Sequence, residues 1–210
     1  MLLAENSIKD YASQLASATP APGGGSAAAL AGALGAALTH MVGAYTEGRA
    51  KYAEYEAFTS ALLERTRAAQ LKLLRLVDED AAAFNSMNAA YKLPKNSEAE
   101  KTTRDGAVQA ALAACTAVPY TIMELCADTL RSTEEAVGKT NQSVVSDLGV
   151  AALCLKTAVQ SAWLNVLVNA GSLKDARLAS EYRKNGRALF DEAVAAADRI
   201  YGAIRQAFEE

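Results

Sequence analysis

The stretch Pro20-Ala21-Pro22-Gly23-Gly24-Gly25-Ser26 precedes Ala27 to Tyr45, a run that carries no formal charge. Two prolines hold the backbone extended, and three glycines allow a ligand or another backbone to approach closely. Ser26 has the residue type that favours a helix N-cap, so a helix is predicted to begin there. Because the run after Ser26 consists mostly of alanine and glycine, it predicts a helix against which other helices pack closely.

An uncharged run of about 20 residues also has the length of a transmembrane span. Its alanines and glycines have little tendency to enter lipid, His40 lies within it, and no basic flank accompanies it. The interior of a helical bundle is therefore the favoured interpretation, and no membrane partner is expected.

Composition narrows the class of protein. The chain has 210 residues and a net charge of −3, with both signs interspersed, so no nucleic-acid partner is expected. Three widely spaced cysteines fit reduced thiols better than a disulfide framework. The first residues lack a signal-peptide pattern, and we expect a cytoplasmic protein.

Helix signals follow one another along the chain, whereas strand and hairpin signals do not. We expect an all-α fold, an antiparallel bundle of about six to eight helices in a single domain, residues 1–210. Two of these helices, over 27–45 and 144–167, are expected to be buried because their sides are small or apolar almost all round. The expected helices cover about 7–19, 26–47, 51–93, 97–137, 141–171 and 173–207, with Pro119 kinking or dividing the fourth.

Several common catalytic sites are excluded by residue counts. His40 is the only histidine, so a two-histidine zinc site and a di-iron bundle are ruled out, and no metal is expected. Packing is the favoured role for His40. The glycine turn is neither a dinucleotide fingerprint nor a P-loop, and it fits a structural turn and a ligand-contacting turn equally well.

Carboxylates on apolar helix faces are the better chemical signal. Asp80 interrupts the stripe formed by Leu73, Leu76, Val77, Phe84 and Met87, and Asp147 lies among apolar residues of the second buried helix. Burial raises the pKa of a carboxyl group towards the range useful for acid–base catalysis. The alternative is that each aspartate is a structural hydrogen-bond acceptor.

Asn165 faces the same way as Asp147, because eighteen residues make five helical turns. The two side chains would then be about 27 Å apart along the helix axis. A long ligand, two chains contributing to one site, or a site that includes only one of them would each account for this separation.

Six motifs, in the same order and spacing, resemble the formiminotetrahydrofolate cyclodeaminase and methenyltetrahydrofolate cyclohydrolase family. They are Pro20 to Ser26, Thr46-Glu47-Gly48-Arg49-Ala50-Lys51-Tyr52, Asp78-Glu79-Asp80-Ala81-Ala82-Ala83-Phe84, Leu93-Pro94-Lys95-Asn96, Ser146-Asp147-Leu148-Gly149-Val150-Ala151 and Leu164-Asn165-Val166-Leu167-Val168-Asn169. The resemblance implies an all-helical homodimer with a tetrahydrofolate derivative as substrate and no permanently bound cofactor. Either activity, cyclohydrolase or cyclodeaminase, is compatible with it.

The same resemblance implies roles for individual residues. Asp80, the second aspartate of its motif, corresponds to the proposed proton acceptor, which agrees with the periodicity argument. Asp147 and Asn165 would line the folate cleft beside the turn of Gly24, Gly25 and Ser26. Lys95 and Arg104 are candidate partners for the glutamate tail. A different class, a non-catalytic helical dimer or interaction module, would keep the fold without binding folate.

Overall fold

The computed structural model describes residues 2–210, which form helices packed together, and no strand occurs in that range. This confirms the all-α expectation. The six α-helices of this range are α1 (Ile8–Leu15), α2 (Gly24–Ala44), α3 (Glu56–Tyr91), α4 (Glu98–Ala136), α5 (Ser146–Ala170) and α6 (Ala176–Glu209). Short 3₁₀ turns cover Leu3–Glu5, Ala50–Tyr55 and Gln142–Val144.

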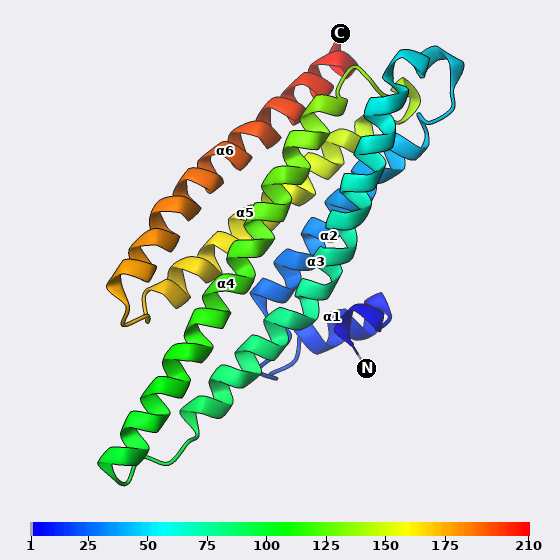
Figure 1. The fold of residues 1–210 in the computed structure, drawn as a ribbon. Coiled ribbons are helices and arrows are strands. Elements are labelled where there is room, and N and C mark those ends of the chain that lie inside the picture. Colours follow the sequence, from blue (N-terminus) through cyan, green and yellow to red (C-terminus); the bar gives the residue numbers. More distant parts are fainter. Residues whose placement is uncertain (1) are drawn as a thin grey trace.

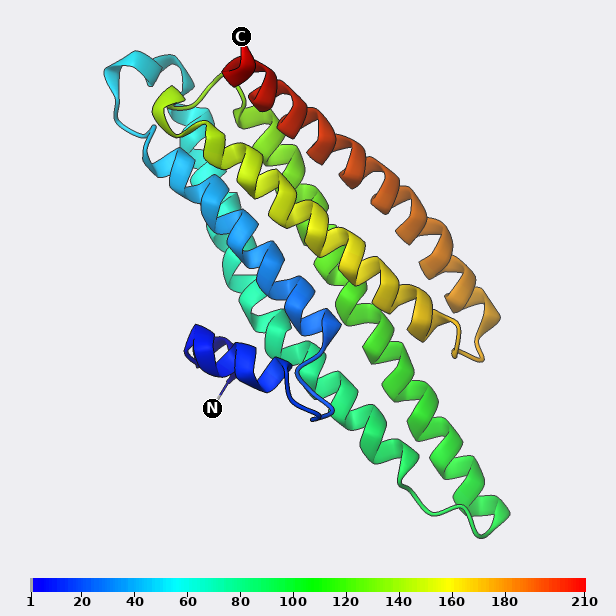
Figure 2. The same cartoon turned by 180° about the vertical axis from the view of Figure 1, so that it is seen from behind.

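Five long helices lie side by side and α1 lies across them (Figures 1 and 2). Helix α5 packs against α2, α4 and α6, while α3 packs against α2 and α4. The α3–α4 hairpin projects beyond the other helices at one end of the bundle, and the C-terminus of α6 lies at the opposite end (Figure 1). The chain thereby brings the start of α2 against the middle of α3.

Small residues of α2 allow its neighbours to approach closely, as the sequence predicts. A Cβ atom on Gly32 would lie 2.7 Å from Cys126 Sγ, and one on Gly35 would lie 2.6 Å from Leu155 Cγ. Neither position leaves room for a side chain. The close packing of α2 therefore depends on glycine where it crosses α4 and α5.

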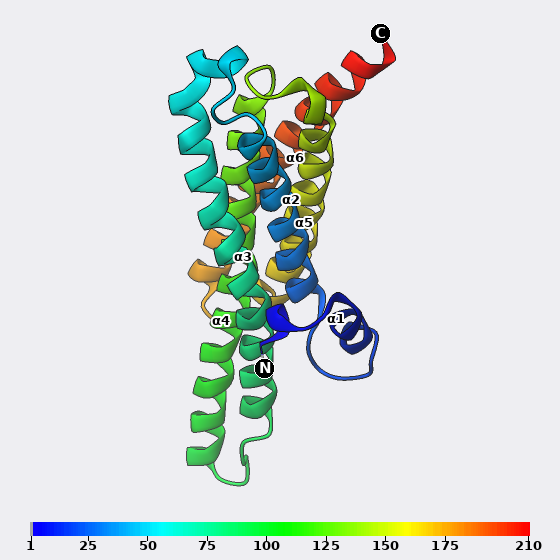
Figure 3. The same cartoon turned by 90° about the vertical axis from the view of Figure 1, so that its right-hand side faces the viewer.

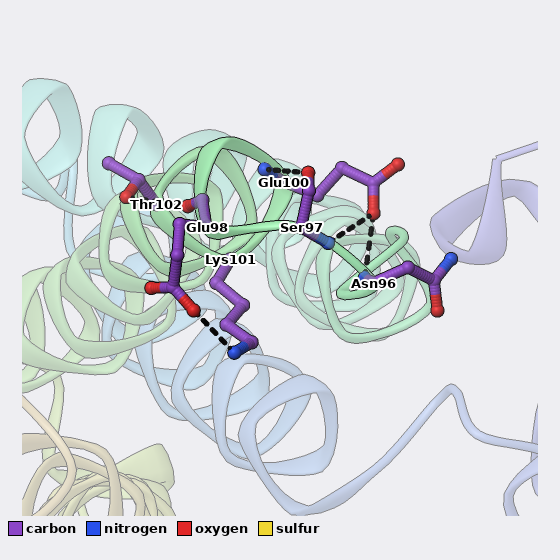
Figure 4. A network of polar contacts seen from close by, with 6 residues as sticks. All are labelled: Asn96, Ser97, Glu98, Glu100, Lys101 and Thr102. Carbon is purple, nitrogen blue, oxygen red and sulfur yellow. Dashed lines mark hydrogen bonds and ion pairs between the residues drawn. The ribbon is translucent and has the colours of Figure 1, made fainter.

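Helix ends match the sequence in some places and differ in others. Ser97 caps α4 in a capping box with Glu100, as predicted, and Figure 4 shows Glu100 also accepting from the backbone of Asn96. Pro119 lies inside α4 without dividing it. Asn141 caps the 3₁₀ turn at Gln142–Val144 rather than the following helix, which begins at Ser146.

Among residues 2–210, three helices are long and apolar enough to cross a membrane: α2, α4 and α5. In the bundle, 50% of the most apolar window is buried in α2 and in α4, and 44% in α5. The interior of the protein therefore provides an apolar environment for about half of each window.

Candidate active site

Asp80 lies on α3 one turn beyond the buried residues Leu76 and Val77, and its side chain is partly exposed. Burial raises the pKa of its carboxyl group above the ordinary value of 3.8, and a hydrogen bond from the backbone of Ser26 acts in the opposite direction. Desolvation is the larger of the two effects. The carboxyl group is thus a stronger proton acceptor than an ordinary aspartate, and solvent still reaches it.

Glycine at position 25 allows the first turn of α2 to lie directly against this carboxyl group. A Cβ atom on Gly25 would be 2.6 Å from Asp80 Cγ and closer still to an oxygen. Gly23 occupies the N-cap position of α2 and Gly25 is its second residue. The turn is therefore part of the surroundings of Asp80.

Ser26 is not the N-cap that the sequence predicts. The helix begins at Gly24, two residues earlier, which places Ser26 in the first turn and fully buried. Its hydroxyl group donates to the backbone oxygen of Val77 at 2.6 Å. Ser26 therefore fixes α2 to α3 through its side chain, while its backbone N–H faces Asp80.

Tyr11 is a residue of this region that sequence reasoning missed. It is the one buried residue of α1, which lies beside the start of α2 (Figure 3). Burial raises the pKa of its hydroxyl group, and a hydrogen bond with the Ser26 side chain lowers it. The charges of Asp80 and Asp78 raise this pKa further. Asp78 in turn accepts hydrogen bonds from the backbone of Leu3 and Ala4, at 2.5 and 3.4 Å, which ties the N-terminal segment to α3.

Residues from α4 and α5 complete the surroundings. Burial and the charge of Asp80 raise the pKa of the Cys115 thiol to about 11, so this thiol is protonated at neutral pH. Asn169 donates to the backbone oxygen of Cys115 at 2.6 Å. Asn165 Nδ2 donates to Ser161 O at 2.9 Å and lies 3.6 Å from the position of a Cβ on Gly24. Asn165 is therefore next to the glycine turn.

Three other predicted site residues lie elsewhere in the same chain. Asp147 is in the first turn of α5, about 27 Å along the helix from Asn165. Lys95 is in the turn between α3 and α4, at the projecting end of the bundle. Arg104 on α4 donates to the backbone oxygen of Tyr91 at 3.2 Å, and Tyr91 is about 16 Å along α3 from Asp80.

One cavity of the described chain lies near Asp80 along α3 but does not include it. A cavity of about 590 Å³ lies between α3 and α4, and Lys72, the part of its lining nearest to Asp80 along the chain, is about 12 Å away along α3. Its lining mixes cations such as Arg65 with acids such as Asp128. The Asp80 region is the stronger candidate site, because its carboxyl group combines a raised pKa, partial exposure and a close backbone turn.

His40 points away from this region. Its Nδ1 atom lies 3.1 Å from Leu63 O and 3.2 Å from Thr66 Oγ1, both on α3. Among residues 2–210, no three histidine, cysteine or acidic side chains are grouped so as to hold a metal ion. The chemistry that the residues around Asp80 can perform themselves is proton transfer.

The sequence matches one protein family and is similar to several known proteins. A family profile described as Formiminotransferase-cyclodeaminase matches residues 7–188. A methenyltetrahydrofolate cyclohydrolase of Methylorubrum extorquens is 40% identical over 198 residues, covering 94% of this chain and 95% of that protein. A formimidoyltransferase-cyclodeaminase of Rattus norvegicus is 36% identical over 202 residues, covering 96% of this chain and 37% of the rat protein.

The structure itself has a solved relative. The crystal structure of formiminotetrahydrofolate cyclodeaminase from Thermotoga maritima superposes with a TM-score of 0.80 at 28% identity, covering 98% of this chain and 96% of that one. The chain therefore spans nearly the whole of the Methylorubrum and Thermotoga proteins, and just over a third of the rat protein.

Proposed function

Because the chain belongs to the formiminotransferase-cyclodeaminase family, we propose that it is a one-carbon folate enzyme, acting as methenyltetrahydrofolate cyclohydrolase, formiminotetrahydrofolate cyclodeaminase, or both. The observation that carries the proposal is Asp80, a partly exposed carboxyl group with a raised pKa beside the first turn of α2. The tetrahydrofolate derivative enters as substrate, and no permanently bound cofactor is required.

In the cyclohydrolase direction, the methenyl carbon between N5 and N10 is an electrophilic amidinium. Asp80 takes a proton from water as the water oxygen bonds to that carbon. Asp80 then returns the proton to N5 as the bond between N5 and the carbon breaks. The second water proton is released to solvent, which leaves 10-formyltetrahydrofolate.

In the cyclodeaminase direction, N10 attacks the formimino carbon and the formimino nitrogen leaves as ammonia. The formimino group reacts in its protonated, amidinium form, so its nitrogen already carries two protons. The same carboxylate takes the N10 proton and passes it to that nitrogen, which then leaves as neutral ammonia. Both reactions need one carbon centre and one proton shuttle. A single aspartate beside the bound pterin is therefore sufficient for the proton transfers of either reaction.

The deciding experiment follows methenyl absorbance with purified protein, starting once from the methenyl and once from the formimino substrate. Asp80→Asn should lower turnover by about 10²–10⁴ with little change in substrate affinity. Glu79→Gln is the matched control, because Glu79 is the exposed neighbour that pairs with Lys72. An Asp80→Asn protein with normal turnover on both substrates would remove Asp80 from the mechanism.

A non-catalytic helical module makes the opposite prediction in a binding measurement. A folate that binds the native protein, present at about 100 times its dissociation constant, should stabilise it by about 2.7 kcal/mol. If no folate shifts the melting temperature and neither substrate turns over, the enzymatic proposal is refuted.

The proposed enzyme is a homodimer joined through α2 and α5. Large apolar side chains are exposed on these adjacent helices, with Leu34 54%, Leu164 64% and Val168 72% exposed. Exposed apolar surface of this kind marks an interface in a soluble protein. The molecular mass in solution should be twice 22.0 kDa, and a monomer at micromolar concentration would contradict the proposal.

A two-fold axis across the middle of α5 would also account for Asp147. In such an antiparallel dimer, the partner's Asp147 comes level with Asn165, because the axis lies midway between the two positions. Each site would then take Asp80 from one chain and Asp147 from the other. This is the reading in which two chains contribute to one cleft.

Subunit complementation tests this arrangement directly. Mixed dimers of Asp80→Asn and Asp147→Asn chains contain one site with both native carboxyl groups if Asp147 acts across the interface. Activity should therefore recover in mixtures, although each variant alone is impaired. If Asp147 acts within its own chain, every site carries one substitution and mixing restores nothing.

Two further assignments extend the proposal. Lys95 and Arg104 are candidates for the glutamate tail, because they lie at the same end of α3 and α4 and carry the required positive charge.

The cysteines of the described chain, Cys115, Cys126 and Cys154, are unpaired. Free thiols fit a reducing compartment, and we assign the enzyme to the cytoplasm.

A further inference from the structure

One face of α3 is covered on one side of Asp80 and open on the other. Val77 and Phe84 lie almost in line along the helix, and Asp80 falls between them on the same face. Val77 is 1% exposed, and its backbone oxygen accepts from Ser26 of α2. Phe84 is 37% exposed. An apolar stripe that belongs to the core before Asp80 therefore continues as open surface after it.

The start of α2 accounts for this change. Gly24 is the first residue of α2, and Gly25 lies directly against the Asp80 carboxyl group. Helix α2 therefore begins level with Asp80, whereas α3 continues to Tyr91 and the α3–α4 hairpin projects beyond it (Figure 1). Phe84 lies one turn further along α3 than Asp80, about 6 Å away along the axis. Its exposed ring thus adjoins the candidate proton acceptor.

A single exposed aromatic residue is common on protein surfaces and has no special meaning. Phe84, however, is followed two turns later on the same face by Tyr91, which is 46% exposed. The Arg104 guanidinium group lies 5.6 Å from the centroid of the Tyr91 ring. From Asp80 onwards, this open face therefore presents a carboxyl group, an aromatic ring and a cation, in that order.

The proposed substrate carries complementary groups in the same order. In a tetrahydrofolate derivative, the reacting carbon is bonded to N10, N10 is bonded to the p-aminobenzoyl ring, and the glutamate carboxylates lie beyond that ring. With the reacting carbon at Asp80, a tail directed towards Arg104 brings the benzoyl ring past Phe84. The opposite orientation would turn the carboxylates away from this cation, which electrostatic complementarity disfavours.

We propose that Phe84 stacks against the p-aminobenzoyl ring of the substrate and thereby fixes the direction in which the folate lies along α3. This inference rests on the proposed function. The pterin then lies towards Asn165 and the turn at Gly24, and the tail runs along the hairpin towards Arg104. Stacked aromatic rings attract each other beyond the effect of the area that they bury. Because the benzoyl ring does not react, the contact is equally strong before and during the reaction, so it lowers KM and leaves kcat unchanged.

The test compares Phe84→Ala with Phe84→Tyr, which keeps an aromatic ring. Phe84→Ala should raise KM for the methenyl substrate about tenfold, with kcat within about threefold of wild type. Phe84→Tyr should keep both constants within about threefold of wild type. If Phe84→Ala does not fold, Phe84→Leu replaces it, because leucine keeps apolar bulk without a ring. Leu71→Ala is the matched control and should change neither constant, because Leu71 is 42% exposed on the opposite face of α3.

Two substrate fragments identify the ring that Phe84 contacts. p-Aminobenzoylglutamate should inhibit wild-type turnover competitively at millimolar concentration. Its inhibition constant should rise about tenfold in Phe84→Ala, while that of tetrahydropterin should not change. A rise for tetrahydropterin instead, or no inhibition of the wild type by p-aminobenzoylglutamate, would overturn the assignment.

Further outcomes separate this inference from the proposed function. A normal KM in Phe84→Ala, with Asp80→Asn inactive, would overturn the role of Phe84 alone. A smaller molecular mass of Phe84→Ala in ultracentrifugation would make the open face of α3 a subunit contact, which would also overturn it. Absence of turnover of both substrates by the wild type would overturn both proposals.

Discussion

Gly25→Ala tests whether the contact between α2 and Asp80 is required for activity. The added Cβ atom would lie 2.6 Å from Asp80 Cγ, about 0.8 Å short of the 3.4 Å at which ordinary contact begins. Because Ser26 holds α2 to α3 through Val77, the carboxyl group has to move rather than the helix. The side chain on which proton transfer depends would then be displaced by close to 1 Å.

A misplacement of this size in a catalytic group costs about 10²-fold in rate, which corresponds to about 2.7 kcal/mol of activation free energy. The global fold should be much less affected, because alanine is favoured over glycine in a helix by up to about 1 kcal/mol. Turnover measured from the methenyl absorbance, alongside the melting temperature, separates the two effects.

Gly23→Ala is the matched control, because a Cβ atom at Gly23 meets nothing within 4 Å. It should retain activity to within about threefold and lose about 1 kcal/mol at most through the weaker N-cap. If Gly25→Ala turned over at the wild-type rate, the position of Asp80 against the helix would be irrelevant to the chemistry.

Five other outcomes are expected. Because burial raises the pKa of Asp80, turnover should fall with decreasing pH from a point above 3.8, the ordinary value, and a pH–rate profile checks this. Because this pKa is raised, the native state binds the Asp80 proton more tightly than the unfolded chain does, and the free energy of unfolding falls as pH rises through the native pKa. Asp80→Asn should therefore melt no lower than wild type at neutral pH. Arg104→Ala should raise KM for polyglutamylated substrate several-fold while kcat stays constant, whereas equal KM values would remove Arg104 from the tail site. Leu164→Glu should convert the dimer into monomers in ultracentrifugation, with activity lost in parallel. The Cys115 thiol, with a pKa of about 11, should resist alkylation at neutral pH, and rapid labelling there would show an open core.

The helical architecture follows from local signals in the sequence. The capping box at Ser97 and Glu100 needs only residues within one turn, and it forms as predicted. Ser26 fails the same reasoning for a tertiary reason, because its hydroxyl group binds the backbone of Val77, 51 residues away. A serine after glycines has the pattern of a cap, and only the packing of α2 on α3 reveals its other use.

The candidate site is readable from the sequence only in part. Asp80 stands out because a charge interrupts an apolar stripe at helical spacing, and this signal is local. Tyr11 has no such signal, since its spacing with Ile8 fits the buried face of any amphipathic helix. Ile8 is in fact 90% exposed, so α1 buries only its tyrosine. Whether Tyr11 lies near Asp80 depends on where α1 packs against the other helices. Periodicity does not determine that packing.

The distance between two residues on one helix is predictable from the sequence, but the site to which each belongs is not. The 27 Å between Asp147 and Asn165 follows from their spacing on a single helix, and α5 is unbroken between them. What the spacing does not provide is the position of a second chain. The complementation experiment supplies that information.

The attachment of the N-terminal segment to α3 has a practical consequence for anyone producing the protein. Leu3 and Ala4 bind Asp78, two residues from Asp80, whereas α6 ends at the far end of the bundle (Figures 1 and 3). An affinity tag fused ahead of Leu2 would crowd the proposed proton acceptor, and one fused after Glu210 would not. Kinetic measurements should therefore be made on protein purified through its carboxyl end.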